Sequence, residues 1–123
     1  MHGVPFVGPQ HRAKKGIEKQ LLARTVSTLY LWPNDNDIRD TFRVLATTIQ
    51  KALKWPNAHF LPDDQFDIVF WDHTGDLALV ELDIELTSSL KLPSDFSFLN
   101  LTGQGLCFID VVNKVLECRG NSH

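Results

Sequence analysis

The chain has 123 residues, which is long enough for one domain with one hydrophobic core and too short for two ordinary domains. Of these residues 43% are hydrophobic and 22% charged, and this composition excludes disorder over the whole length. No apolar run approaches the roughly 20 residues of a membrane-spanning helix, residues 1–10 lack the pattern of a secretory signal, and two cysteines are too few for a disulfide framework, so we expect a cytoplasmic protein with no membrane partner. The net charge of −3 conceals an asymmetry, because five of the six charged residues in 1–33 are basic whereas residues 63–95 hold nine carboxylates and one lysine, which argues against nucleic acid as a partner.

The N-terminal third predicts one flexible segment and one helix. Residues 1–12 contain two glycines and two prolines without hydrophobic periodicity, so we expect a flexible N-terminus. Residues 13–31 predict a helix, and the extra N-terminal element ends at Pro33 because proline disfavours helical backbone in the residue before it. Its predicted inward residues are Leu22, Val26, Leu29 and Tyr30. Its basic residues, Lys15, Lys19 and Arg24 among them, are expected in solvent, where they would allow self-association with the acidic side of another copy.

Two further helices are predicted from apolar residues that recur every three or four positions. The first follows Asp35 or Asn36, either of which can cap it, and ends at Trp55-Pro56. Its inward residues are Ile38, Phe42, Leu45, Ile49 and Leu53. The second covers residues 105–117 and stops before Gly120. Its inward residues are Leu106, Ile109, Val112, Val115 and Leu116.

Residues 77–90 are compatible with two structures. Apolar and acidic residues alternate from Val80 to Leu86, which is typical of a half-buried strand, and with the apolar run before it this predicts a β-hairpin at 66–86 in an α+β fold. As a helix, the same residues form two apolar stripes on nearly opposite sides. One stripe consists of Leu77, Val80 and Ile84, and the other of Leu79, Leu82, Leu86 and Leu90.

The order of these elements and one short motif resemble the acyl carrier protein family. The run from Gly75 to Leu82, Gly-Asp-Leu-Ala-Leu-Val-Glu-Leu, resembles the start of the second carrier helix, where Asp-Ser-Leu and two further residues precede Val-Glu-Leu. Leu92-Pro93-Ser94-Asp95 resembles the Ile-Pro-Asp that ends that helix, and the likeness covers about residues 38–117. It implies a mostly α fold, a small helical bundle over 34–118 preceded by the extra helix of 13–33, and this would override the strand pattern.

The residue at the attachment position departs from the family pattern. Carriers esterify phosphopantetheine to the serine of Asp-Ser-Leu, but Asp76 stands there and a carboxylate cannot accept that phosphodiester. Thr74 lies two residues before the position and Ser88 about three helical turns after it, so both hydroxyls are displaced from it. The resemblance therefore implies a non-catalytic interaction domain without a cofactor, which docks on a basic protein surface such as that of a biosynthetic enzyme. The predicted partner-binding residues are Asp76, Glu81, Asp83 and Glu85.

Alternatives of other classes remain open at this stage. One is a true acyl or peptidyl carrier whose attachment hydroxyl is misaligned here. Another is a nuclease-like or hydrolase-like α+β remnant, in which Asp67 and Glu81 would share a metal on a hairpin, although Asp83 occupies the usual lysine position. Residues 72–76 offer two carboxylates and a histidine, but turn chemistry and a helix-capping Asp76 explain them without a metal. Cys107 is expected to be an inert buried thiol, so no catalytic residue and no metal ligand is predicted.

Overall fold

The structure, a computed structural model, describes residues 9–72 and 76–120, and the side chains of 12–72 and 77–119. These residues form helices and no strand; the only bridge between extended segments in this part of the chain joins Gln65 to Cys107. The elements are α1 (Pro9–Ala23), the 3-10 helix η1 (Val26–Leu31), α2 (Asn36–Leu53), α3 (Phe66–Val69), α4 (Asp76–Ser89), the 3-10 helix η2 (Leu99–Leu101) and α5 (Phe108–Gly120). The mostly α fold is confirmed, and the predicted hairpin at 66–86 is wrong, because α3 and α4 occupy that range.

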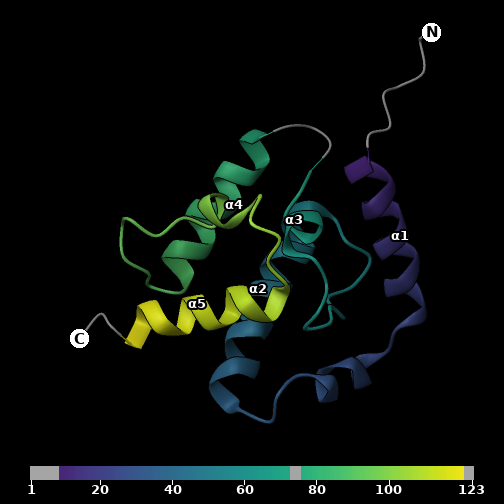
Figure 1. Cartoon of the computed structure of the whole chain (residues 1–123), viewed down its shortest axis with the longest axis horizontal. Coiled ribbons are helices and arrows are strands. Elements are labelled where there is room, and N and C mark those ends of the chain that lie inside the picture. Colours follow the sequence, from purple (N-terminus) through teal and green to yellow (C-terminus); the bar gives the residue numbers. More distant parts are fainter. Residues whose placement is uncertain (1–8, 73–75, 121–123) are drawn as a thin grey trace, which may run out of the picture.

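Helix α2 is the centre of the bundle, and its sequence sets both of its ends. The Asp35 carboxylate caps it by accepting the N–H of Ile38 at 3.1 Å, as one of the two expected caps. It stops at Lys54, which takes a left-handed backbone with φ of 59°. The predicted inward face is confirmed: Ile38 is half-buried, and Phe42, Leu45, Ile49 and Leu53 are buried. α5 and α4 pack on this helix, and Figure 1 shows α5 crossing it.

The core is built around Phe108, the first residue of α5. Its ring lies 5.4 to 6.1 Å, centre to centre, from four other aromatic rings supplied by three other parts of the chain. These rings belong to Trp32, Phe42, Phe60 and Phe66. Most of these ring pairs meet edge to face, an arrangement that stabilises aromatic pairs beyond the area they bury. The backbone joins the same segments, since the Phe66 N–H donates to the Leu106 carbonyl and the Phe108 N–H to the Asp64 carbonyl.

The last helix differs from its prediction at both ends. It begins at Phe108 and not at 105, because Gly103 and Gly105 adopt left-handed backbone with φ of 80° and 68°. The Cys107 N–H donates to the Asp110 carboxylate at the start of the helix. Gly120 is its last residue and does not lie beyond its end. Of the predicted inward residues, Val112 and Val115 are buried, and Leu106, Ile109 and Leu116 are half-buried.

The predicted helix at 13–31 is wrong, because the chain forms two helices there. α1 begins at Pro9, so residues 9–12 of the expected flexible N-terminus are helical, and it ends at Ala23. Thr25 is extended and its hydroxyl accepts the Ser27 N–H, which starts η1 in a new direction. The predicted inward face therefore spans two helices, and three of its four members, Leu22, Val26 and Tyr30, are exposed. Ile17 and Leu21 are the apolar residues that α1 buries, and Lys14 is buried beside them.

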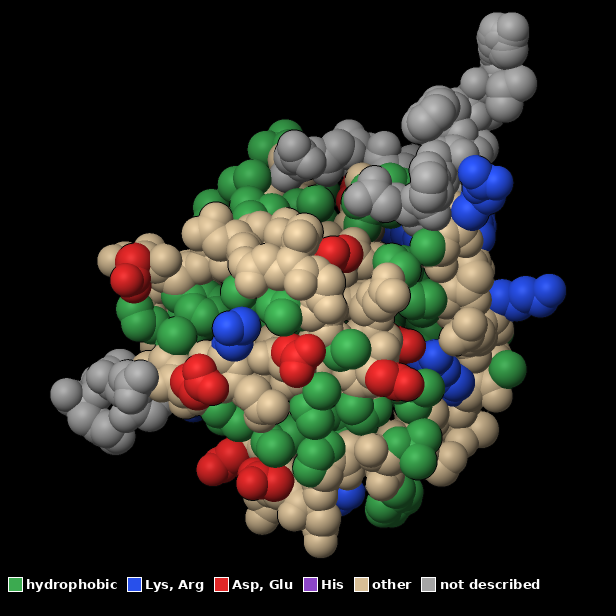
Figure 2. Space-filling view, in the orientation of Figure 1, with side chains coloured by type: hydrophobic (Ala, Val, Ile, Leu, Met, Phe, Trp, Pro, Cys, Tyr) green, Lys and Arg blue, Asp and Glu red, His purple; other side chains and the backbone are tan. Residues whose placement is uncertain are grey.

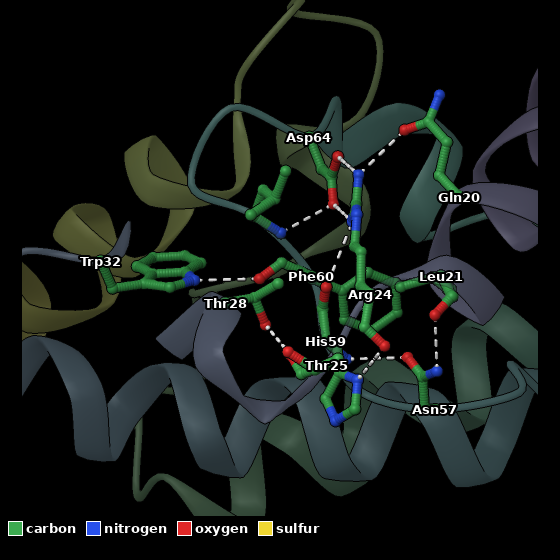
Figure 3. A network of polar contacts seen from close by, with 11 residues as sticks. Gln20, Leu21, Arg24, Thr25, Thr28, Trp32, Asn57, His59, Phe60 and Asp64 are labelled. Atoms are coloured by element: carbon green, nitrogen blue, oxygen red, sulfur yellow. Dashed lines mark hydrogen bonds and ion pairs between the residues drawn. The ribbon is translucent and has the colours of Figure 1, made fainter. Parts of the chain in front are cut away.

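Polar contacts hold the N-terminal part against the loop that follows α2 (Figure 3). The Arg24 guanidinium donates to both carboxylate oxygens of Asp64, at 2.8 and 3.1 Å, and to the His59 carbonyl at 3.2 Å. The Asn57 amide donates to the Leu21 carbonyl at 2.8 Å. Arg24 was expected in solvent, but its side chain is 11% exposed and that of Asp64 is 8% exposed. The ion pair is thus largely removed from water, so its contribution to stability depends on its hydrogen-bond geometry.

Candidate docking surface

Helix α4 presents one apolar stripe to the core and the other to solvent. Leu79, Leu82, Leu86 and Leu90 are the inward residues, each 7% exposed or less. The outward stripe is made of Leu77, Val80 and Ile84, which are 73%, 39% and 65% exposed. Residues spaced by three and four lie on one side of a helix, so these three side chains form a row. Figure 2 shows hydrophobic side chains gathered over the first turns of α4. The sequence predicted both stripes, and the structure decides which one the core takes.

Two carboxylates flank the outward stripe. Glu81 and Glu85 are exposed, and neither forms an ion pair with a residue that the structure describes. Glu81 follows Leu77 by one turn, and Glu85 follows Glu81 by another, so both lie along the row. We call the five residues Leu77, Val80, Glu81, Ile84 and Glu85 the α4 docking face. Exposed aliphatic side chains beside unpaired carboxylates suit an apolar surface with basic groups at its rim.

Asp83 lies on a different side of α4. Residues two apart in a helix point about 200° from each other, so Asp83 cannot share a side with Glu81 and Glu85. Its two carboxylate oxygens accept the Ser97 hydroxyl and the Phe98 N–H, each at 2.8 Å. Asp83 thereby holds the segment before η2 against α4, and we leave it out of the α4 docking face.

Asp76, the fourth predicted partner-binding residue, is the first residue of α4. Its side chain and residues 73–75 lie outside the described part of the chain, so its predicted capping role, the attachment position and the candidate metal ligands in 72–76 are not described. Ser88, one of the two alternative hydroxyls, is exposed in the last turn of α4. No group of three potential metal ligands occurs among the residues that were described.

A groove of about 600 Å³ adjoins the α4 docking face. Val80 belongs to both, and the groove extends from there to α3 and to the loop after η2. Its lining is formed by Asp67, Phe70, Trp71, Leu79, Val80, Leu99, Thr102 and Gly103. Asp67 fixes one wall, because its carboxylate accepts the Gly103 N–H at 2.9 Å. The lining is polar and apolar in similar parts, so the groove can receive a partner side chain that has both an aliphatic and a polar portion. The sequence grouped Asp67 only with the nuclease alternative, which depends on a hairpin, whereas the described residues of 66–86 contain two helices and no strand.

Two further kinds of reactive side chain, a buried lysine and two cysteines, lie outside the α4 docking face. The Lys14 ammonium lies 4.9 Å from the ring centre of Trp55 and 5.9 Å from that of Trp71, and donates to the Trp71 carbonyl at 3.5 Å. Burial lowers the pKa of Lys14 below its ordinary value of 10.5, against the opposing effect of the Asp72 carboxylate. Nothing in the helical spacing singled out this lysine.

Cys107 was expected within a helix, but it immediately precedes α5. Both Cys107 and Cys118 are half-buried free thiols.

Comparisons with protein families, curated proteins and solved structures return no match. Among the described residues, the longest apolar stretch of any helix falls short of what a membrane span requires. The α4 docking face is therefore interpreted from its own geometry and charge.

Proposed function

We propose that this chain is a non-catalytic protein-interaction domain that docks a basic partner through the α4 docking face. The observation that carries the proposal is the exposure of Leu77, Val80 and Ile84 on a helix whose other side fills the core. Exposed side chains of this size in a row are typical of interaction surfaces, because leaving them in water costs free energy that a partner's apolar surface recovers. Glu81 and Glu85 would accelerate association with a basic surface and disfavour acidic ones.

The resemblance to acyl carrier proteins supports the same proposal from another direction. The resemblance implies the order first helix, long loop, second helix, short helix and last helix. The chain follows this order: α2 is followed by a long connection that contains α3, and then come α4, η2 and α5. α4 begins at Asp76, the residue that replaces the carrier serine. We accordingly propose a carrier-like domain that works by contact and carries no phosphopantetheine.

Photo-crosslinking tests the docking proposal. A benzophenone amino acid placed at Leu77, which is exposed on α4, should capture a basic protein in the organism's own cells, whereas the same probe at the exposed Thr47 of α2 should not. The captured protein is then purified and titrated against the chain. The E81K/E85K variant should bind it at least tenfold more weakly, and higher salt should weaken the wild-type complex. The control variant D95K/E117K changes the net charge equally at exposed positions outside α4 and should bind as the wild type does.

Three results would contradict the proposal. The first is capture with equal yield from Leu77 and Thr47, and the second is binding that E81K/E85K leaves unchanged. The third is a gain of one phosphopantetheine arm in intact mass after incubation with coenzyme A and a phosphopantetheinyl transferase, which would make the chain a true carrier. The S88A variant then tells whether Ser88 is the hydroxyl that was modified.

A further inference from the structure

A second exposed surface on the same chain combines basic and apolar side chains. Arg12, Lys15, Lys19 and Leu22 are exposed and are spaced by three, four and three residues, which places them on one side of α1. Figure 2 shows Lys and Arg side chains along the edge of the molecule that α1 forms. The apolar side chains continue after α1, because Val26, Tyr30 and Leu31 of η1 are 75%, 76% and 66% exposed. We call Arg12, Lys15, Lys19, Leu22 and Val26 the α1 basic face.

The described residues leave this surface uncovered, although they pack against the other side of the same helix. α1 buries Ile17 and Leu21 and packs on α3, while Arg24 and Asn57 fix its C-terminal end. The helix is therefore held in one orientation, and the α1 basic face is a fixed part of the surface. Glu18, which is half-buried, lies three residues after Lys15 and four before Leu22, so it borders the row, and the three cations of the face outnumber this one carboxylate.

The two faces are complementary in charge and in apolar content. The α4 docking face has two unpaired carboxylates beside three aliphatic side chains, and the α1 basic face has three cations beside two. From Leu77 to Glu85 the first extends about 12 Å, and from Arg12 to Leu22 the second extends about 15 Å, at 1.5 Å per residue. One helix can therefore lie along the other. Figure 1 shows α1 along one edge of the molecule and α4 in the other half, with α3 between them, so the two faces belong to separate parts of the surface.

We propose that the α1 basic face of one copy binds the α4 docking face of another copy. This inference rests on the docking role proposed for α4 and names a second copy of the chain as a partner. Because the two surfaces differ, the contact is heterologous, and repeating it yields a ring or a growing chain rather than a closed two-fold dimer. The carboxylates on α4 and the net charge of −3 oppose an anionic bilayer or a nucleic acid as the alternative ligand.

Light scattering of the full chain provides the first test. At about 20 mM salt the weight-average mass should rise with protein concentration above that of the monomer, and at about 500 mM salt it should return to the monomer mass, because the screening length falls severalfold over this range. The variants I84K and L22D each place, at an exposed position of one face, a charge that the opposing face repels, and both should remain monomeric. The control variant V44D, which changes an exposed valine of α2, should associate as the wild type does. Far-UV circular dichroism checks that all three fold.

Mixing the two defective variants tests which surfaces meet. I84K retains the α1 basic face and L22D retains the α4 docking face, so a mixture contains one functional contact per pair of chains. It should form a 1:1 dimer and nothing larger. Association that L22D leaves intact would mean that the α1 basic face does not take part in it and would overturn the proposal, as would a mixture that stays monomeric.

The same measurements separate this inference from the docking function. A wild-type chain that is monomeric at every concentration and salt overturns the inference, while capture of a different basic protein from Leu77 preserves the docking role. Sedimentation of a monomeric chain with anionic phosphatidylserine vesicles, lost in L22D, would assign the α1 basic face to a membrane instead. If neither copies of the chain nor any other protein is captured through α4, both proposals fail.

Discussion

Two parts of this molecule are held in place by different kinds of contact. The bundle of α2, α4 and α5 is joined by buried aliphatic and aromatic side chains around Phe108. The N-terminal part, α1 and η1, contributes three aliphatic side chains to the core, Ile17, Leu21 and the half-buried Leu29, and is also joined by the Arg24–Asp64 pair, the Asn57 amide and the Lys14 ammonium. Close packing of side chains loses stability whenever side-chain volume is removed, whereas the polar contacts of the N-terminal part depend on single atoms and on charge.

The largest effect is expected from breaking the packed part. Replacing Phe108 by alanine removes a ring that contacts four others, and we expect a loss of about 3–5 kcal/mol in the free energy of unfolding, measured by guanidinium denaturation. The variant I84A, at an exposed position, should change it by less than about 0.5 kcal/mol. Similar losses in the two variants would show that the bundle does not depend on the aromatic cluster.

The next largest effect is expected from the ion pair of the N-terminal part. The variant D64A leaves the Arg24 guanidinium largely buried without its carboxylate, and removes the acceptor of the Leu61 N–H, for a loss of about 2–3 kcal/mol. Hydrogen exchange should accelerate in α1 and η1 more than in α2 and α5. The matched control is D40A, which breaks an ion pair whose side chains are 72% and 62% exposed and should leave exchange unchanged. Uniform acceleration across all helices would mean that the N-terminal part is not a separate unit.

This contrast explains which elements the sequence could predict. α2 was predicted with its cap and its inward face, because apolar spacing and Asp35 are local signals. The two stripes of α4 were visible, but the pattern also fitted a strand, and the choice depended on neighbours that only the fold supplies. The helix at 13–31 failed because its end is fixed by Asn57, His59 and Asp64, more than thirty residues away.

The residues of the candidate site likewise include some that the sequence predicted and some that it did not. Glu81 and Glu85 lie where a helical reading of the motif places them, in solvent beside the outward stripe. The engagement of Asp83 with Ser97 and Phe98 had no signal in the sequence, since any carboxylate at that position fits the acidic pattern. The α1 basic face was anticipated only as a charge asymmetry, and the exposure of Leu22 and Val26 requires the break at Thr25.

A smaller effect tests a polar contact inside the packed part. The variant D83A should lower the free energy of unfolding by about 1–2 kcal/mol, because the Phe98 N–H and the Ser97 hydroxyl lose their acceptor. The variant E81A changes an exposed residue two positions earlier, on a different side of α4. It should leave the free energy of unfolding unchanged within error and should affect partner binding alone. Equal stability of both variants would return Asp83 to the set of surface carboxylates.

The smallest effect concerns the buried cation of the N-terminal part, and it appears as a dependence on pH. Desolvation lowers the pKa of Lys14 in the folded chain, whereas in the unfolded chain the pKa returns to about 10.5. Between these two values the unfolded chain binds a proton that the folded chain has lost, so the free energy of unfolding rises with pH across that window. The variant K14M lacks this contribution, and K15M, at the exposed neighbouring position, retains it. Denaturation midpoints from pH 7 to 10.5 should therefore rise in the wild type and K15M relative to K14M, and a constant difference would mean that the ammonium is as well stabilised by Trp55, Trp71 and Asp72 as it is by water.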